Sequence, residues 1–243
     1  ADTIKRHALL AEETALAHDN VKAVNGVAVT TSHSMRYAEA TNGSSRFGVK
    51  TYFATSASVI AERDDNMQNG YAATFARHFN DMEDPIELGK RAAFDAIKAL
   101  NPEKPATGEM PIVLSPSAAK TFFSSVLTGI NGAEIRNGRS FMKDKIGELI
   151  LPKNISIIDN PLVTRGLRSS HVDSSGLFAK PITFVREGIL ETFNMNLEQS
   201  RALGYDAIGR GAGLTNTSII GGEKSVSELI ADIKDGIYVD GFQ

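Results

Sequence analysis

The sequence of 243 residues contains no cysteine and no tryptophan, and aromatic residues make up only 7% of it. Without cysteine, disulfides, thiol nucleophiles and thiolate metal sites are excluded within the chain. Apolar runs are also short, and none approaches the ~20 residues that a membrane-spanning helix needs. We therefore expect no membrane association, and the absence of cysteine fits a cytoplasmic location.

An excess of positive charge is missing as well. The chain has 26 Lys and Arg against 29 Asp and Glu, which gives a net charge of -3 and a pI near 6.0. Such a balance does not create the positive field that a nucleic-acid backbone attracts, so we expect no nucleic-acid partner. The 42% of hydrophobic residues is ordinary for a globular protein, and the length allows one large or two smaller domains.

Helix-start signals divide the sequence into clear segments. Asp84-Pro85 and Ser115-Pro116 each place a capping side chain before a proline at the first helical position, and Ser225 with Glu228 forms a capping-box pattern. The apolar spacing predicts further helices over residues 3–18 and 197–203, the second ended by Gly204.

Strand-like segments alternate with these helices in groups. The expected strands of the first part lie at residues 21–31, 35–40, 47–62 and 71–78, with Asn25-Gly26 as a turn and 64–70 as a connecting loop. Later strands are expected at 111–114, 155–158, 176–192 and 215–220. Because the alternation is not that of regular βαβ units, the sequence predicts an α+β fold.

A proline- and glycine-containing segment at residues 101–109 is the best linker in the sequence. It suggests an N-terminal α+β domain over residues 1–101 and a C-terminal, more β-rich α+β domain over 110–243. The chain begins with Ala1 rather than Met and ends at Gln243 without an obvious terminal element. We expect it to be a piece of a longer protein, truncated at both ends.

Residue patterns for metal binding are absent. No two of the five histidines lie within one helical turn of each other, so the helical His pair of a zinc peptidase is missing. A site assembled from distant histidines remains open at this point. Asp64, Asp65 and Asn66 lack the glycine and glutamate of a calcium loop and are better read as a solvated loop.

Three patterns are suggestive of other chemistry. Ser117 and Lys120 match the Ser-x-x-Lys pattern of penicillin-binding enzymes, but the companion motifs are missing, so Ser117 is better read as a first-turn helix residue. His171 and Asp173, near Ser169 and Ser170, supply triad residue types without any sign that they converge. The glycine-rich segment 209–213 does not fit a phosphate loop, and its glycines indicate close approach of the backbone to another group, such as a peptide or partner.

Several blocks taken together resemble a known family. They are Phe47-Gly48-Val49-Lys50, residues 56–62, 111–119 and 140–147, Asp173-Ser174-Ser175-Gly176, residues 185–190, Arg201-Ala202-Leu203-Gly204, and residues 211–216. Their order and spacing resemble the TldD/PmbA family, formerly described as modulators of DNA gyrase. The resemblance covers nearly the whole chain. Each block alone is weak, but the ordered set is specific.

The resemblance implies a role for one helix. In this family TldD-type subunits carry a His-Glu-x-x-x-His helix that binds zinc and cleaves peptides, whereas PmbA (TldE) subunits lack it and pair with TldD. The corresponding helix here follows Ser115, and the resemblance puts Ser124, Ser125 and Gly129 where the first histidine, the glutamate and the second histidine would stand. A neutral hydroxyl is a poor zinc ligand and glycine has no side chain, so no catalytic or metal-binding residue is expected in this chain.

The resemblance therefore predicts a non-zinc subunit of a TldD/TldE-type metallopeptidase complex, with no cofactor of its own and zinc in a TldD-type partner. It implies a heterodimer with that homologous subunit, or self-association, and short or unfolded peptides as substrates. Ser124, Ser125, Gly129 and Asn131 would line the substrate chamber. Two alternatives stay open: a non-enzymatic regulator or binding module of the gyrase-modulator type, and an independent serine hydrolase that uses Ser117 and Lys120.

Overall fold

The computed structural model describes residues 2–41, 43, 45–211 and 213–242, and its chain divides into two units. The first unit consists of residues 1–105 with 165–167, and the second of residues 106–164 with 168–243. Each unit combines helices with mainly antiparallel strands, which confirms the predicted α+β class. None of the helices in the described part of the chain is both long and apolar enough to cross a membrane.

The first unit is a three-stranded antiparallel sheet with helices on one face. Its elements are α1 (Asp2–Leu16), β1 (Val21–Glu39), β2 (Ser45–Arg63), β3 (Asn66–Ala76), the short helix η1 (Phe79–Asp81) and α2 (Pro85–Lys98), and the strand order is β1-β2-β3. Asp84 caps α2 as predicted, since its side chain accepts a hydrogen bond from Ile86 N.

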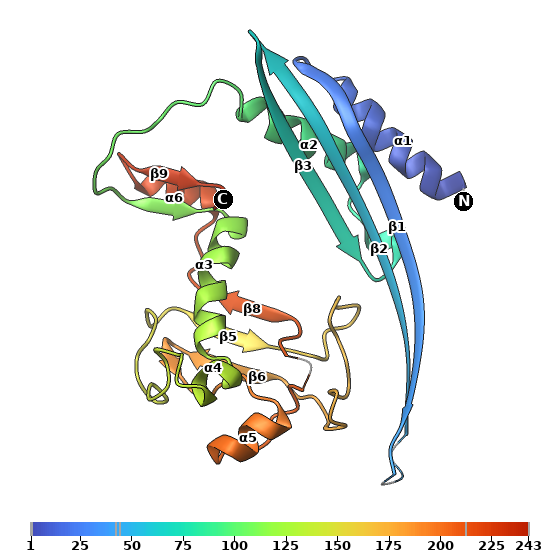
Figure 1. Ribbon diagram of the computed structural model, residues 1–243. Helices are drawn as coiled ribbons and strands as arrows, with labels where there is room; N and C mark the ends of the chain where they lie inside the picture. The colour runs from blue at the N-terminus through green and yellow to red at the C-terminus, as the bar shows by residue number, and fades with distance from the viewer. Residues whose placement is uncertain (1, 42, 44, 212, 243) are drawn as a thin grey trace. The chain divides into compact units, whose positions relative to one another are not determined.

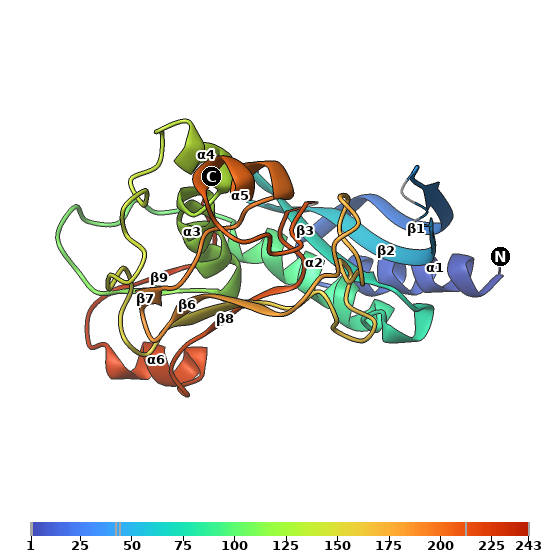
Figure 2. The same ribbon diagram turned by 90° about the horizontal axis from the view of Figure 1, so that it is seen from below.

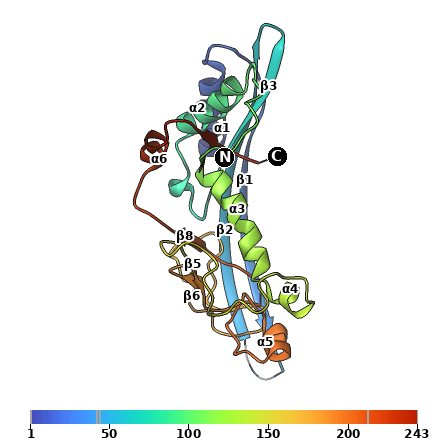
Figure 3. The ribbon, with the colours of Figure 1, turned by 90° about the vertical axis from the view of Figure 1, so that its left-hand side faces the viewer.

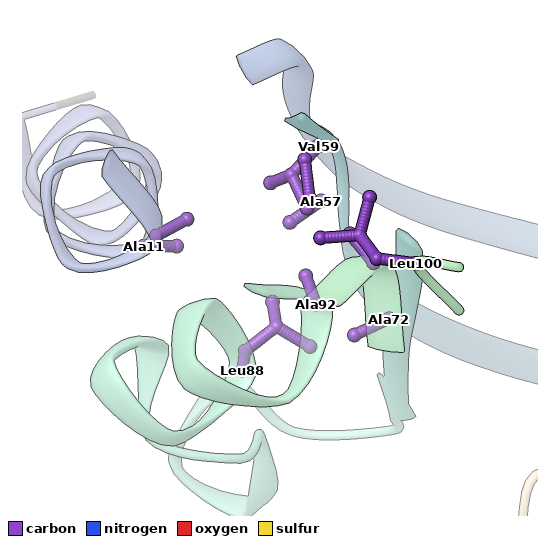
Figure 4. Packing of buried hydrophobic residues seen from close by; sticks show 10 residues of the cluster. Ala11, Ala57, Val59, Ala72, Leu88, Ala92 and Leu100 are labelled. Atoms are coloured by element: carbon purple, nitrogen blue, oxygen red, sulfur yellow. The ribbon is translucent and has the colours of Figure 1, made fainter. Parts of the chain in front are cut away.

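The core of this unit lies between the sheet and the two helices. Alternate residues of β2 are buried, and Figure 4 shows Ala57 and Val59 facing Ala11 of α1 together with Leu88 and Ala92 of α2. Small side chains dominate this core and allow close approach. At Gly70 of β3 a Cβ atom would lie 2.2 Å from Ala92 O, so only glycine fits beneath α2 there.

Two sequence expectations for this sheet are wrong. Asn25-Gly26 is not a turn: β1 continues from Val21 to Glu39 as one strand, and a register shift between Val24 and Gly26 marks a bulge. The connecting loop expected over residues 64–70 shrinks to Asp64 and Asp65, whose φ angles of 49° and 61° make a tight two-residue hairpin turn. Asn42, between the expected strands 35–40 and 47–62, lies outside the described residues.

Strands β1 and β2 extend well beyond β3, as Figures 1 and 3 both show. Strand β3 pairs with β2 only from Arg63 to Phe53, whereas β1 and β2 remain paired as far as Glu39 and Ser45. Residues 32–39 and 45–52 therefore form a two-stranded extension, which we call the arm. Its residues are almost all exposed.

The second unit contains two sheets. Strands β5 (Ser156–Asp159), β6 (Ile182–Arg186), β7 (Ile189–Leu190) and β8 (Thr217–Ile220) form an antiparallel sheet in the order β7-β6-β5-β8, part of which is seen edge-on in Figure 2. Strands β4 (Ile112–Leu114) and β9 (Ile237–Val239) pair in parallel and form a separate two-stranded sheet. Residues 176–181, expected to be part of a strand, are irregular.

Four helices accompany these sheets: α3 (Pro116–Gly129), α4 (Gly132–Arg136), α5 (Leu197–Leu203) and α6 (Val226–Asp232). The predicted caps of α3 and α6 are present, and Gly204 ends α5 with a φ of 76°, as expected for a left-handed cap. Helix α4 was not predicted. The core joins α3 and α4 to the larger sheet through side chains such as Ile130, Ile135, Phe184 and Phe193.

Candidate functional site

The candidate site is built where α3 ends and α4 begins, within the second unit. Helix α3 ends at Gly129, and Asn131 starts α4 by accepting a hydrogen bond from Ala133 N at 2.9 Å. Asn194 holds this junction, because its backbone N–H donates to Ile130 O and its carbonyl accepts from Gly132 N, each at 2.8 Å. The two helices are therefore fixed to the segment that follows β7.

Two open hollows lie on this junction, and together they contain all four residues predicted to line a chamber. The first, of about 290 Å³, is lined by Ser124, Ser125, Thr128, Gly129, Glu134, Arg139, Ser140 and Phe141. The second, of about 510 Å³, is lined by Ser124, Leu127, Thr128, Asn131, Ala133, Glu134, Asn194 and Leu214. Ser124, Thr128 and Glu134 belong to both, so the hollows are neighbours.

The hydroxyl groups of the site are partly engaged by the main chain. Ser124 Oγ donates to Thr121 O at 2.6 Å and Thr128 Oγ1 donates to Ser124 O at 2.9 Å. Ser140 Oγ donates to Gly129 O and accepts from Met142 N. These hydroxyls thus face the hollows mainly as acceptors, because their protons are used within the chain.

One ion pair dominates the electrostatics of the site. Arg139 Nε and Nη2 donate to the two carboxylate oxygens of Glu134 at 3.0 and 2.8 Å, which is a bidentate arrangement. The hydrogen bond from Arg139 lowers the pKa of Glu134, and the same bond raises the pKa of Arg139. The pair consists of two charged groups and carries no net charge.

The residues at this site do not fit a zinc ion. Ser124 and Ser125 are hydroxyls, Gly129 has no side chain, and the carboxylate of Glu134 is already held by Arg139. A Cβ atom at position 129 would lie 3.0 Å from Met142 Cγ and 3.1 Å from Phe141 Cζ, closer than ordinary contact. Across the described residues, no group of three or more His, Cys, Asp and Glu is placed to hold a metal ion.

The two alternative nucleophile patterns receive no support from the geometry. Ser117 and Lys120 are exposed on α3 and line neither hollow. Asp173 instead orders the backbone: Oδ1 accepts from Ser175 N and Leu177 N, and Oδ2 accepts from Gly211 N at 2.8 Å. The hydroxyls of Ser169 and Ser170 donate to backbone carbonyls.

Part of the close approach expected of the glycine-rich segment 209–213 is to the chain itself. A Cβ atom on Gly211 would lie 2.5 Å from Ser174 Oγ, next to Asp173. Arg210 of this segment is buried, and Ala212 lies outside the described residues.

The sequence predicted four of the thirteen residues that line the hollows, and the other nine were missed. Glu134, Arg139, Ser140 and Phe141 follow α3 directly, and Asn194 comes from a distant segment. A local signal for part of this set exists: Asn131 followed three residues later by Glu134 is a helix-start pattern that predicts α4. No local signal indicates Asn194.

Comparison with known proteins places this geometry in a family. Residues 1–100 match the model of the PmbA/TldA metallopeptidase central domain, and residues 107–243 match that of the C-terminal domain. The chain belongs to the PmbA/TldD family. The resemblance inferred from the sequence is therefore confirmed, and the chain is a member of a metallopeptidase-related family.

Among its relatives is the metalloprotease PmbA homolog of Haemophilus influenzae, which is 29% identical over 86% of this chain and 47% of its own length. The metalloprotease PmbA of Escherichia coli O157:H7 is 28% identical over 78% of this chain and 42% of its own. The chain thus spans about half the length of these PmbA/TldD relatives. The TldD homolog of Haemophilus influenzae is also related, at 23% identity over 96% of this chain.

Solved structures show the same fold. A protein described as a modulator of a DNA gyrase from Thermotoga maritima superposes with a TM-score of 0.90 at 26% identity, over 99% of this chain and 57% of that one. TldE from Thermococcus kodakarensis superposes with a TM-score of 0.86 at 20% identity, over 100% of this chain and 57% of that one.

Proposed function

We propose that this PmbA/TldD chain is the non-zinc partner subunit of a TldD/TldE-type metallopeptidase complex that degrades or processes short or unfolded peptides. The resemblance puts Ser124, Ser125 and Gly129 at the positions of the zinc helix, and one observation supports the proposal: these three residues line the first open hollow. In this proposal zinc and the catalytic glutamate belong to a homologous TldD-type chain, and this chain contributes part of the chamber.

The chemistry of the hollow suits holding a peptide rather than cleaving it. Ser124 and Thr128 present hydroxyl oxygens whose protons are already donated, so they can accept peptide N–H groups. Arg139 and Glu134 add charged groups at the same rim. No residue here would polarise a water molecule in the way that a zinc-bound site does.

Packing at Gly129 supports the same assignment. A histidine at this position would have to displace Phe141 or Met142, since even a Cβ atom is tightly placed. A side chain at position 129 would therefore require the exposed ring of Phe141 or the side chain of Met142 to move.

The first experiment compares the protein alone with the protein mixed with its TldD-type homologue, in an assay of peptide hydrolysis. We expect cleavage only in the mixture, abolished by a zinc chelator and restored by zinc. Chelator-sensitive cleavage by this protein alone would contradict the partner-subunit role.

The second experiment fills the hollow. Ser125→Trp places a large side chain in the first hollow, whereas Ser227→Trp adds the same side chain at an exposed position of α6 outside it. Complex formation is first verified for both variants. We expect Ser125→Trp to lower kcat/KM on the order of ten-fold or more, equivalent to at least ~1.4 kcal/mol. Ser227→Trp should leave kcat/KM unchanged. Equal activity of the two complexes would remove Ser125 from the chamber.

A further inference from the structure

Asn194 lines the second hollow and is held in place there by its backbone. Its N–H donates to Ile130 O and its carbonyl accepts from Gly132 N, each at 2.8 Å, and the residue forms a parallel bridge with Asn131. Because both backbone polar groups are used, the Cα atom is fixed at the junction of α3 and α4. The side chain therefore starts from a set place beside the hollow.

The carboxamide of Asn194 is buried but makes no use of its hydrogen-bonding groups. The residue is only 6% exposed, and its Oδ1 atom has no hydrogen-bond partner in the described structure. Its Nδ2 atom donates to none of the described residues either. A buried amide without hydrogen bonds lowers stability, so native proteins keep few such groups and each one needs an explanation.

Three other buried side-chain atoms of the described residues lack a hydrogen-bond partner, and all three belong to the first unit. They are His7 Nε2, Thr55 Oγ1 and Glu62 Oε2, and Glu62 forms an ion pair with Lys22. None of these residues lines either hollow. Asn194 alone among the four combines an unused buried group with a place on an open hollow.

Asn216, in the same unit, shows how a carboxamide that serves the fold is bonded. Its Nδ2 atom donates to Asn160 O at 2.8 Å and to Ser169 Oγ at 2.9 Å, and its Oδ1 atom accepts from Arg168 N at 3.2 Å. Asn216 lies outside both hollows. The contrast indicates that the carboxamide of Asn194 serves a group other than those of the described chain.

The rest of the second hollow restricts what that group can be. Apolar surface comes from Leu127, Ala133 and Leu214. Among the lining residues only Glu134 is charged, and Arg139 holds its carboxylate through two hydrogen bonds. An ionised ligand group would lose hydration here without meeting an unpaired opposite charge. A purely apolar group would leave the carboxamide of Asn194 without a partner.

We infer that the second hollow binds a neutral amide group of a peptide and that Asn194 pairs with this amide. A half-turn about the terminal side-chain torsion exchanges the oxygen and the nitrogen of Asn194, so the residue can accept or donate from the same place. The primary amide of a glutamine side chain can form two hydrogen bonds with it at once, and a main-chain amide can form one. The hollow of about 510 Å³ lies within the ~300–1,000 Å³ of ligand pockets.

This inference rests on the proposed function, because the second hollow is part of the proposed peptide chamber. Its test requires neither the TldD-type partner nor cleavage. A mixture that fails to hydrolyse peptides would leave a measured binding result intact. Absence of binding, in turn, would leave the partner-subunit role untouched, so the two failures can be told apart.

The binding test uses NMR of the isotope-labelled protein alone. It follows the side-chain NH₂ signals of Asn194, which are assigned by their absence in Asn194→Leu. The probes are three peptides, acetyl-Gly-X-Gly-N-methylamide, in which X is glutamine, glutamate or methionine. Glutamate has the shape of glutamine but carries a charge, and methionine has a similar length without an amide. All three peptides contain the same main-chain amides.

We expect the glutamine peptide to shift the Asn194 signals saturably, with an affinity on the order of ten-fold above that of the other two if the side-chain amide is bound. Equal shifts by all three peptides that are lost on methylation of their main-chain nitrogens would identify a main-chain amide instead. Both results support the inference. It would be overturned by no shift with any peptide, by a preference for glutamate or methionine, or by equal shifts that survive methylation.

A second measurement separates binding from a structural role. Asn194→Leu replaces an unused buried amide by an apolar group, so Tm should stay unchanged or rise by up to about 4 °C. Peptide binding, followed through the backbone signals of Thr128, should be lost. The matched control, Asn216→Leu, should lower Tm and leave binding unchanged. Equal losses of Tm in the two variants, or unchanged binding by Asn194→Leu, would overturn the inference.

Discussion

Arg210 Nε donates to Asp159 Oδ2 at 2.8 Å, and both side chains are fully buried. Both carboxylate oxygens and both terminal nitrogens of the pair also make further hydrogen bonds. Asp159 accepts from Thr215 and Thr217, and Arg210 Nη2 donates to Lys180 O at 2.6 Å. The network ties the end of β5 to the segment that leads into β8.

We predict that Arg210→Met or Asp159→Asn alone lowers the free energy of unfolding of the second unit by ~3–5 kcal/mol, because a buried charge or its partner is left uncompensated. The double variant should recover part of this loss, which urea denaturation measures as a coupling energy. Arg136→Met, which breaks the exposed pair with Glu198, should cost less than ~1 kcal/mol. Losses of equal size at both pairs would contradict the buried network.

His7 makes the stability of the first unit depend on pH. Its ring is buried, lies 5.4 Å from that of Phe79, and has an Nε2 atom without a hydrogen-bond partner in the described structure. Burial lowers the pKa of His7 below its ordinary value of 6.5, while Asp84 opposes the shift. The unfolded chain therefore binds more protons, and stability falls as the pH drops below 6.5.

We expect urea denaturation to show a lower stability at pH 5.5 than at pH 7.5, and His7→Gln to reduce this difference because it removes the buried titrating group. His33→Gln, at an exposed position of the arm, should retain it. An unchanged pH dependence in His7→Gln would show that other groups cause it.

Gly70 permits the close approach of α2 to the sheet. Gly70→Ala would bring a Cβ atom to 2.2 Å from Ala92 O and 2.4 Å from Ala96 N, and backbone atoms cannot rotate away. We predict a loss of ~3 kcal/mol or more in the free energy of unfolding of the first unit. Gly48→Ala, where nothing lies within 4 Å, should be neutral or slightly stabilising. Comparable losses in both would argue against the tight contact.

The ion pair at the candidate site gives a prediction that does not require activity. Arg139→Gln should raise the pKa of Glu134 toward its ordinary value of 4.5, because the hydrogen bonds that favour its ionised form are weakened. Titration of the Glu134 carboxyl by NMR measures the shift. Arg136→Gln, on the same helix but paired with Glu198, should leave the Glu134 midpoint in place.

Much of the fold could be predicted from the sequence because its helix signals are local. The caps at Asp84, Ser115 and Ser225 depend on a few neighbouring residues, and each is present in the structure. The turn predicted at Asn25-Gly26 was wrong because the same dipeptide suits a bulge as well as a turn. Pairing with β2 decides between the two. That pairing is a property of distant residues.

The candidate site shows the same division. Ser124, Ser125, Gly129 and Asn131 could be named because the family resemblance points to the helix after Ser115 and its end, and the structure places them around two neighbouring hollows. Asn194 could not be named, because only folding brings its segment to the start of α4. The ion pair between Asp159 and Arg210 could not be predicted for the same reason, since 51 residues separate the two in the sequence. Whether the hollows line a peptide chamber stays a prediction for the assays above.

The parallel pair of β4 and β9 has a consequence for synthesis on the ribosome. Ile112 pairs with Ile237, which lies near the end of the described residues. Strand β4 can therefore pair only after β9 has been synthesised. The helices and strands of the first unit, by contrast, all lie within its first hundred residues, and only residues 165–167 join it from later in the chain. A nascent chain would therefore carry a folded first unit and an exposed β4 edge for most of the time needed to translate the second, which is the interval in which chaperones would act on it.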